Sequence, residues 1–127
     1  MTALPATARA VLSALLLSVP AVAAAAEATQ FVTGMGDVPA MPGLTLAENG
    51  ALLFDKPGGR IVESVMRGRV ERRAVLAFYA QTMPELGWRR VADTRFEREG
   101  EELRLEFPGG GAAKAGQITV RFILTPR

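Results

Sequence analysis

One stretch of the chain, RRAVLAFYAQTMPELGW at residues 72–88, decides the fold because its hydrophobic spacing differs from that of the segments on both sides. Its apolar residues recur at helical spacing: Val75, Leu76, Phe78, Tyr79 and Met83. Such a stripe covers one face of a helix and packs on a core. The pattern therefore predicts one amphipathic helix from Arg72 to Met83.

The end of this helix is marked by a proline and a glycine. Pro84 has no amide hydrogen and disfavours helical geometry at the preceding residue, so we expect the helix to stop at Met83. Gly87 can adopt the left-handed conformation that reverses the chain. Trp88 then begins the returning strand inside the core.

Three strands are predicted before the helix. Residues 44–48 and 51–55 flank Asn49-Gly50, and Asn-Gly is the strongest short signal for a two-residue hairpin turn. Residues 60–70 alternate between small or apolar side chains and charged ones, which is typical of a strand with one buried face. The face that we expect to be buried consists of Val62, Ser64, Met66, Gly68 and Val70.

Three more strands are predicted after the helix, at residues 88–98, 102–107 and 117–126. The first is expected to bend at Asp93-Thr94. Residues 108–116 are rich in glycine, which favours a flexible loop.

The resulting order, β-β-β-α-β-β-β, predicts the α+β class, with a single antiparallel sheet of about five to six strands and one helix packed on one face. The predicted organisation is a signal peptide at 1–26, an extended or poorly ordered lead-in at 27–43, and a single α+β domain at 44–127. The exposed face of the sheet is then expected to carry Glu63, Arg67, Glu97, Arg104, Glu106 and Arg121.

The first 26 residues have the order of a secretory signal peptide: one positive charge at Arg9, an apolar run, a break at Pro20, and small residues before Glu27. We expect cleavage after Ala25 or Ala26 and a periplasmic or secreted protein. The alternative is an uncleaved leader that anchors the chain in the membrane. After the leader, no segment is long enough to span a bilayer.

Composition excludes several classes of function. Removal of Arg9 with the leader lowers the formal net charge from +2 to +1, which does not favour binding of nucleic acid or anionic membranes. The chain contains no cysteine, so it has neither disulfides nor a lipidation site at a cysteine.

The sequence offers no catalytic, cofactor-binding or metal-binding residues. It lacks histidine and cysteine, the commonest general base and the thiol nucleophile. Ser64 is expected to pack inward, and glutamates that alternate with arginines are typical of a solvated sheet surface. The glycines at 109–111 do not resemble a phosphate-binding loop.

Arginines on the exposed sheet face form the candidate interaction surface, for which we select Arg67, Arg104 and Arg121. They would dock an acidic partner or a polyanion. The simpler interpretation is a mixed-charge face that keeps the domain soluble, because glutamates run through the same strands.

The segment at 78–88 contains the pattern F-Y-x-x-x-M-P-x-L-G-W, formed by Phe78, Tyr79, Met83, Pro84, Leu86, Gly87 and Trp88. This pattern resembles one found in small exported proteins and lipoproteins of Gram-negative bacteria, most of them uncharacterised. The likeness covers roughly residues 44–107 and implies a shared fold, with no known active site. This chain differs from the lipoprotein members because it has no lipidation cysteine.

These features predict an exported periplasmic domain that is not an enzyme and that binds a partner, such as an envelope protein, through the charged face or a sheet edge. The alternative is a small cell-envelope hydrolase that uses carboxylates. A small-molecule carrier would need a cavity between helix and sheet, which a domain of this size can hardly accommodate.

Overall fold

The computed structural model describes residues 2–3, 30–111 and 116–127. The apolar run and cleavage site of the expected signal peptide lie outside these residues, as does the middle of the expected glycine-rich loop. The start of that loop, Pro108–Gly111, is a short 3-10 helix, η1.

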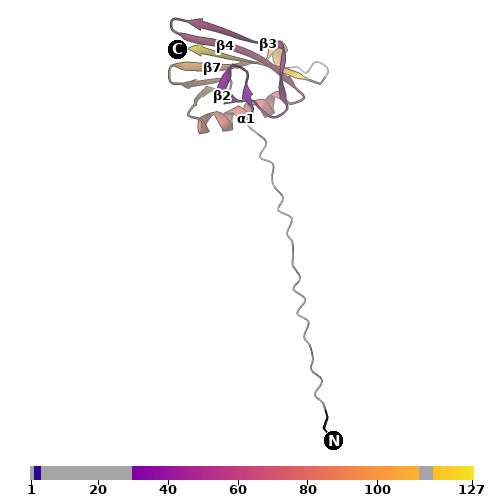
Figure 1. The fold of residues 1–127 in the computed structure, drawn as a ribbon. Coiled ribbons are helices and arrows are strands. Elements are labelled where there is room, and N and C mark those ends of the chain that lie inside the picture. The colour runs from indigo at the N-terminus through magenta and orange to yellow at the C-terminus, as the bar shows by residue number, and fades with distance from the viewer. Residues whose placement is uncertain (1, 4–29, 112–115) are drawn as a thin grey trace.

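The main element is a six-stranded antiparallel sheet with the strand order β3-β4-β8-β7-β6-β5 (Figure 1). Its strands are β3 (Leu44–Lys56), β4 (Gly59–Gly68), β5 (Arg89–Ala92), β6 (Arg95–Arg98), β7 (Glu101–Glu106) and β8 (Ile118–Pro126). The helix α1 (Arg72–Glu85) connects β4 to β5 on the far edge, and the chain then returns through β6 and β7 to β8, which pairs with β4. The α+β class is therefore confirmed.

The core lies between the sheet and α1, where the alternation in β4 and β8 is confirmed. Ser64 pairs with Phe122 and Met66 with Val120, and all four side chains are buried. Gly68 is also buried, and a Cβ there would lie 2.0 Å from the carbonyl oxygen of Gly43. The small residue at this position lets the start of β3 approach β4 closely.

The helix packs on this core as its spacing predicts. Val75, Tyr79 and Met83 are buried, and the rings of Tyr79 and Phe122 meet edge to face at 5.4 Å. Phe78 packs against the same core from a partly buried position.

The end of α1 differs from the prediction by two residues. The helix continues through Pro84 to Glu85 rather than stopping at Met83. Gly87 has a φ of +88°, its N–H donates to the Pro84 carbonyl, and the Trp88 N–H donates to the Met83 carbonyl, both at 3.1 Å. This pair of bonds satisfies carbonyls of the last turn. Because proline has a φ close to the helical value and lacks only its own amide bond, the final turn accommodates it.

The predicted hairpin at Asn49-Gly50 is wrong. Residues 44–48 and 51–55 belong to one strand, β3, whose pairing with β4 jumps from Leu46↔Met66 to Ala51↔Ser64. A type I′ turn needs positive φ at both central residues, but only Asn49 has one, at +53°. The left-handed residue therefore makes a bulge of several residues within a strand instead of a reversal.

The expected strand at 88–98 is also wrong, because it is a hairpin. β5 and β6 are antiparallel neighbours that turn at Asp93-Thr94, where we expected only a bend. The main sheet thus has two strands before the helix and four after it, in place of three and three.

The lead-in contributes to the core, so the packed unit begins before Leu44. It contains β1 (Phe31–Val32) and β2 (Met35–Pro39), which form a second, two-stranded sheet, so the expectation of a single sheet is wrong. Val32, Met35 and Val38 are fully buried. The buried Tyr79 hydroxyl donates to the Pro39 carbonyl at 2.8 Å and accepts from the Met41 N–H at 3.2 Å. Burial raises the pKa of Tyr79 well above its usual value.

Candidate functional site: the charged face of the sheet

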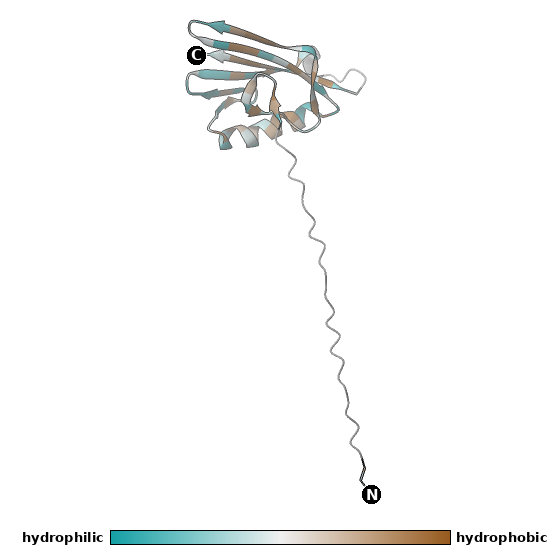
Figure 2. Cartoon of the chain, in the orientation of Figure 1, coloured by the Kyte–Doolittle hydropathy of each residue, from teal (hydrophilic) through white to brown (hydrophobic). Residues whose placement is uncertain are grey.

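The charged face is the side of the main sheet turned away from α1. Strand register places on it the residues that alternate with the buried ones along β4, β8, β7 and β6. The six predicted residues all lie there: Glu63, Arg67, Glu97, Arg104, Glu106 and Arg121. In Figure 2 hydrophilic and hydrophobic residues are mixed along the strands of the main sheet.

Arg121 occupies the centre of this face and is held by two carboxylates. Its Nε lies 3.1 Å from a carboxylate oxygen of Glu63 on β4, and its Nη1 lies 3.3 Å from one of Glu106 on β7. The register explains the arrangement, because Arg121 stands between Val65 and Glu106. Its positive charge is therefore balanced within the domain.

Arg67 is a cation of this face that has no carboxylate partner among the described residues. It lies on β4 opposite Thr119 and is exposed, and no carboxylate of the described residues lies within 4.0 Å of it. Arg67 and Arg121 are diagonal neighbours across the β4–β8 pair, a placement that separates two residues by about 7–8 Å at the backbone.

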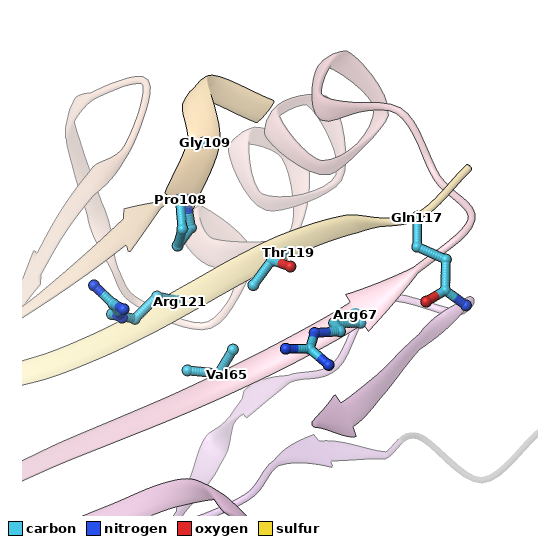
Figure 3. A pocket seen from close by; sticks show the side chains of 7 residues that line it. All are labelled: Val65, Arg67, Pro108, Gly109, Gln117, Thr119 and Arg121. Carbon is cyan, nitrogen blue, oxygen red and sulfur yellow. The ribbon is translucent and has the colours of Figure 1, made fainter. Parts of the chain in front are cut away.

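These two arginines line a pocket of about 450 Å³ (Figure 3). Val65 forms its floor together with Thr119, Pro108 and Gly109 border it on the η1 side, and Gln117 completes the rim. The lining combines one available guanidinium, two uncharged polar side chains and a small apolar surface. It can accept a carboxylate and the short aliphatic stem that carries it.

Arg104 lies on the same face but does not line this pocket. It is exposed on β7, between Ile123 of β8 and Arg95 of β6. Arg104 and Arg95 face each other across the two strands, which is unfavourable for like charges. Together they form a positive patch on this face. The structure therefore brings together two of the three predicted arginines, and the third lies two strands away from Arg67.

Three glutamates of the charged face, Glu63, Glu97 and Glu106, are engaged in ion pairs. Glu97 accepts from Arg89 at 2.6 Å and lies 3.1 Å from Arg127, and its side chain is only 14% exposed. Within the described part of the chain, no three carboxylates come together in a way that would hold a metal ion. Ser64 is fully buried, as its inward position predicts.

Two features of the surface could not be found from sequence spacing. Arg98 joins the two sheets, because its guanidinium pairs with Asp37 of β2 and lies 4.5 Å from the centre of the Trp88 ring. The other feature is the exposed edge of β3, which bears Leu52, Leu53 and Phe54. The first feature depends on a contact between segments that are far apart in the sequence, and the second depends on the order of the strands in the sheet.

The chain matches no known protein-family profile, no curated protein and no solved structure. The resemblance of residues 78–88 to small exported domains therefore stays a prediction. Among residues 2–3, 30–111 and 116–127, no helix has the length and hydropathy needed to cross a bilayer.

Proposed function

We propose that this chain is an exported periplasmic domain, not an enzyme, that binds an acidic segment of an envelope protein on its charged face. The observation that carries the proposal is the pocket in which Arg67 has no carboxylate partner among the described residues while Arg121 beside it has two. An exposed, unpaired guanidinium at the edge of a concave surface is suited to a carboxylate from another molecule, because arginine binds it through two parallel hydrogen bonds.

The rest of the pocket supports a side chain rather than a free ion as the ligand. Thr119 and Gln117 supply hydrogen-bonding groups next to Arg67, and Val65 and Pro108 supply an apolar surface. A glutamate or aspartate on a partner chain would place its charge on Arg67 and its methylene groups against Val65. The positive patch at Arg104 and Arg95 would add attraction for further acidic residues, which increases the rate of encounter.

The ion pairs of the face support a binding role over hydrolysis by carboxylates. Glu63 and Glu106 both contact Arg121, and Glu97 contacts Arg89 and Arg127. A glycosidase needs a pair of carboxyl groups that are free to act on the scissile bond, whereas these three are bound to arginines of the same domain.

The test is capture of partners from envelope extract by the immobilised mature chain. Arg67→Glu is expected to reduce capture at least tenfold, because it replaces attraction to a carboxylate by repulsion. Arg73→Glu is the matched control, since Arg73 is 92% exposed on α1, on the other side of the sheet, and the change in net charge is the same. Arg104→Glu is expected to cause a smaller loss.

Arg121 is a poor probe despite its central position, because its reversal would bring a third carboxylate to Glu63 and Glu106 and disturb the fold. Equal capture by the wild-type chain, Arg67→Glu and Arg73→Glu would refute the assignment of the pocket. Melting temperatures of all variants, measured by circular dichroism, separate loss of binding from loss of fold.

A further inference from the structure

Strand β3 is an edge strand whose outer side has no partner among the described residues. It also carries four of the seven large hydrophobic side chains that are exposed in the described part of the chain: Leu46, Leu52, Leu53 and Phe54. The last three are consecutive and 51%, 58% and 51% exposed. They project to both faces of the sheet, because successive residues of a strand alternate in direction.

An edge of this kind is a template for pairing, because alternate residues present free N–H and C=O groups outward. Natural proteins protect such edges with bulges, charges or proline. In β3 the bulge at residues 47–50 protects only the first part of the strand. The second part, from Ala51 to Lys56, pairs regularly with β4 from Ala51↔Ser64 to Lys56↔Gly59 and has its charges only at the end.

We propose that this edge is a homodimer interface in which β3 of one copy pairs antiparallel with β3 of a second copy about a two-fold axis at Leu53. Leu53 then faces Leu53 of the second copy, and Leu52 faces Phe54. The two six-stranded sheets become one continuous sheet. The interface is isologous, so each contact away from the axis occurs twice.

The sequence of the edge fits a second copy of itself. In this register Asp55 faces Ala51 and Lys56 faces Gly50, so no like charges oppose each other, which would be unfavourable. The apolar pairs form on both faces: Leu52 and Phe54 on the charged face, Leu53 on the helix side. In a two-fold pair centred on Leu53, the outward backbone N–H and C=O groups between Ala51 and Asp55 of one copy pair with those of the same five residues in the second copy.

The helix side of the edge also has room for the contact. A hollow of about 180 Å³ lies beside Leu53, lined by Thr33 and Gly34 of the β1–β2 turn and by Ala51, Leu52 and Val62. The side chains of the two Leu53 residues would pack at its mouth. The Arg67 pocket lies over the inner strands β4 and β8, so pairing along the edge strand β3 leaves it open. The dimer proposal therefore does not depend on the proposed function.

The absence of cysteine from the chain makes a direct test available. Directly opposed residues of antiparallel strands have Cα atoms about 4.5–5.5 Å apart, within the range that a disulfide spans. Leu53→Cys in the mature chain is therefore expected to form a disulfide-linked dimer under mild oxidation. Leu86→Cys is the matched control, because Leu86 is 43% exposed, follows α1, and lies outside β3.

A second measurement uses the equilibrium itself. Light scattering coupled to size exclusion is expected to show concentration-dependent dimers of the mature chain, and Leu53→Lys is expected to raise the dissociation constant at least tenfold by placing two like charges on the axis. Its melting temperature should remain close to that of the wild-type monomer, because the side chain is exposed. A monomer at every concentration, a dimer indifferent to Leu53→Lys, or equal cross-linking of Leu53→Cys and Leu86→Cys would overturn the proposal.

Discussion

Trp88→Ala is expected to be one of the most destabilising single changes in this domain. Trp88 is 2% exposed and begins the chain's return beneath α1, where its ring also contacts the Arg98 guanidinium. Truncation of a buried tryptophan leaves a cavity and typically costs about 3–5 kcal/mol. Loss of the contact with Arg98 adds up to about 1 kcal/mol.

One term acts in the opposite direction. The indole N–H of Trp88 is buried without a hydrogen-bond partner in the described part of the chain, so truncation also removes an unsatisfied donor. The net loss should then be about 3 kcal/mol, a large share of the stability of a small domain. At about 4–8 °C for each kcal/mol, the melting temperature should fall by at least about 12 °C.

The assay is urea unfolding followed by far-ultraviolet circular dichroism, because the variant lacks the only tryptophan of the chain. Leu86→Ala is the control, since Leu86 is two residues away but 43% exposed, and its loss should stay below about 1 kcal/mol. Equal midpoints for Trp88→Ala and the wild-type chain would refute the packing of α1 and β5 described above.

Three other predictions concern the helix contact, the carboxylates and the leader. Tyr79→Phe should lower stability by about 1–2 kcal/mol in urea unfolding, because it removes the buried bond to a carbonyl. Burial raises the folded-state pKa of Tyr79, so stability should be constant below the unfolded pKa of about 10 and fall above it, and Tyr79→Phe should weaken this alkaline loss. Glu106→Gln should leave the melting temperature nearly unchanged, because its ion pair with Arg121 is partly exposed and contributes little, whereas a hydrolase that used Glu106 would lose turnover. Mass spectrometry of the exported protein should find an N-terminus near Ala26 or Glu27 in the soluble periplasmic fraction, and a full-length chain in the inner membrane would contradict this.

Local sequence predicted the elements that depend on local physics. The spacing of Val75, Tyr79 and Met83 located α1, and Gly87 located its reversal, because both follow from helical geometry and backbone sterics. The alternation in β4 and β8 located the buried face for the same reason.

The errors arose where one local signal is compatible with two structures. Positive φ at Asn49 occurs in a hairpin turn and in a bulge, and only the long pairing of β3 with β4 decides between them. Asp93-Thr94 is likewise compatible with a bend and with a turn, and the outcome depends on how β6 pairs with β7.

The candidate site was predicted only as a face. Alternation placed Arg67, Arg104 and Arg121 on the same side of the sheet, but strand order decides which of them are neighbours. Since β4 and β8 are far apart in sequence, neither the shared pocket nor the ion pairs of Arg121 could be derived from spacing.

The most direct test of the binding proposal is methyl nuclear magnetic resonance of the mature chain, titrated with the envelope partner that it captures. The proposal predicts chemical-shift changes at the methyl groups of Val65 and Thr119, which line the Arg67 pocket, and none at Val75, which is buried under α1. The same titration of Arg67→Glu should show no changes at either position. Shift changes confined to α1, or unchanged signals at Val65 and Thr119 in a saturated complex, would contradict the proposal.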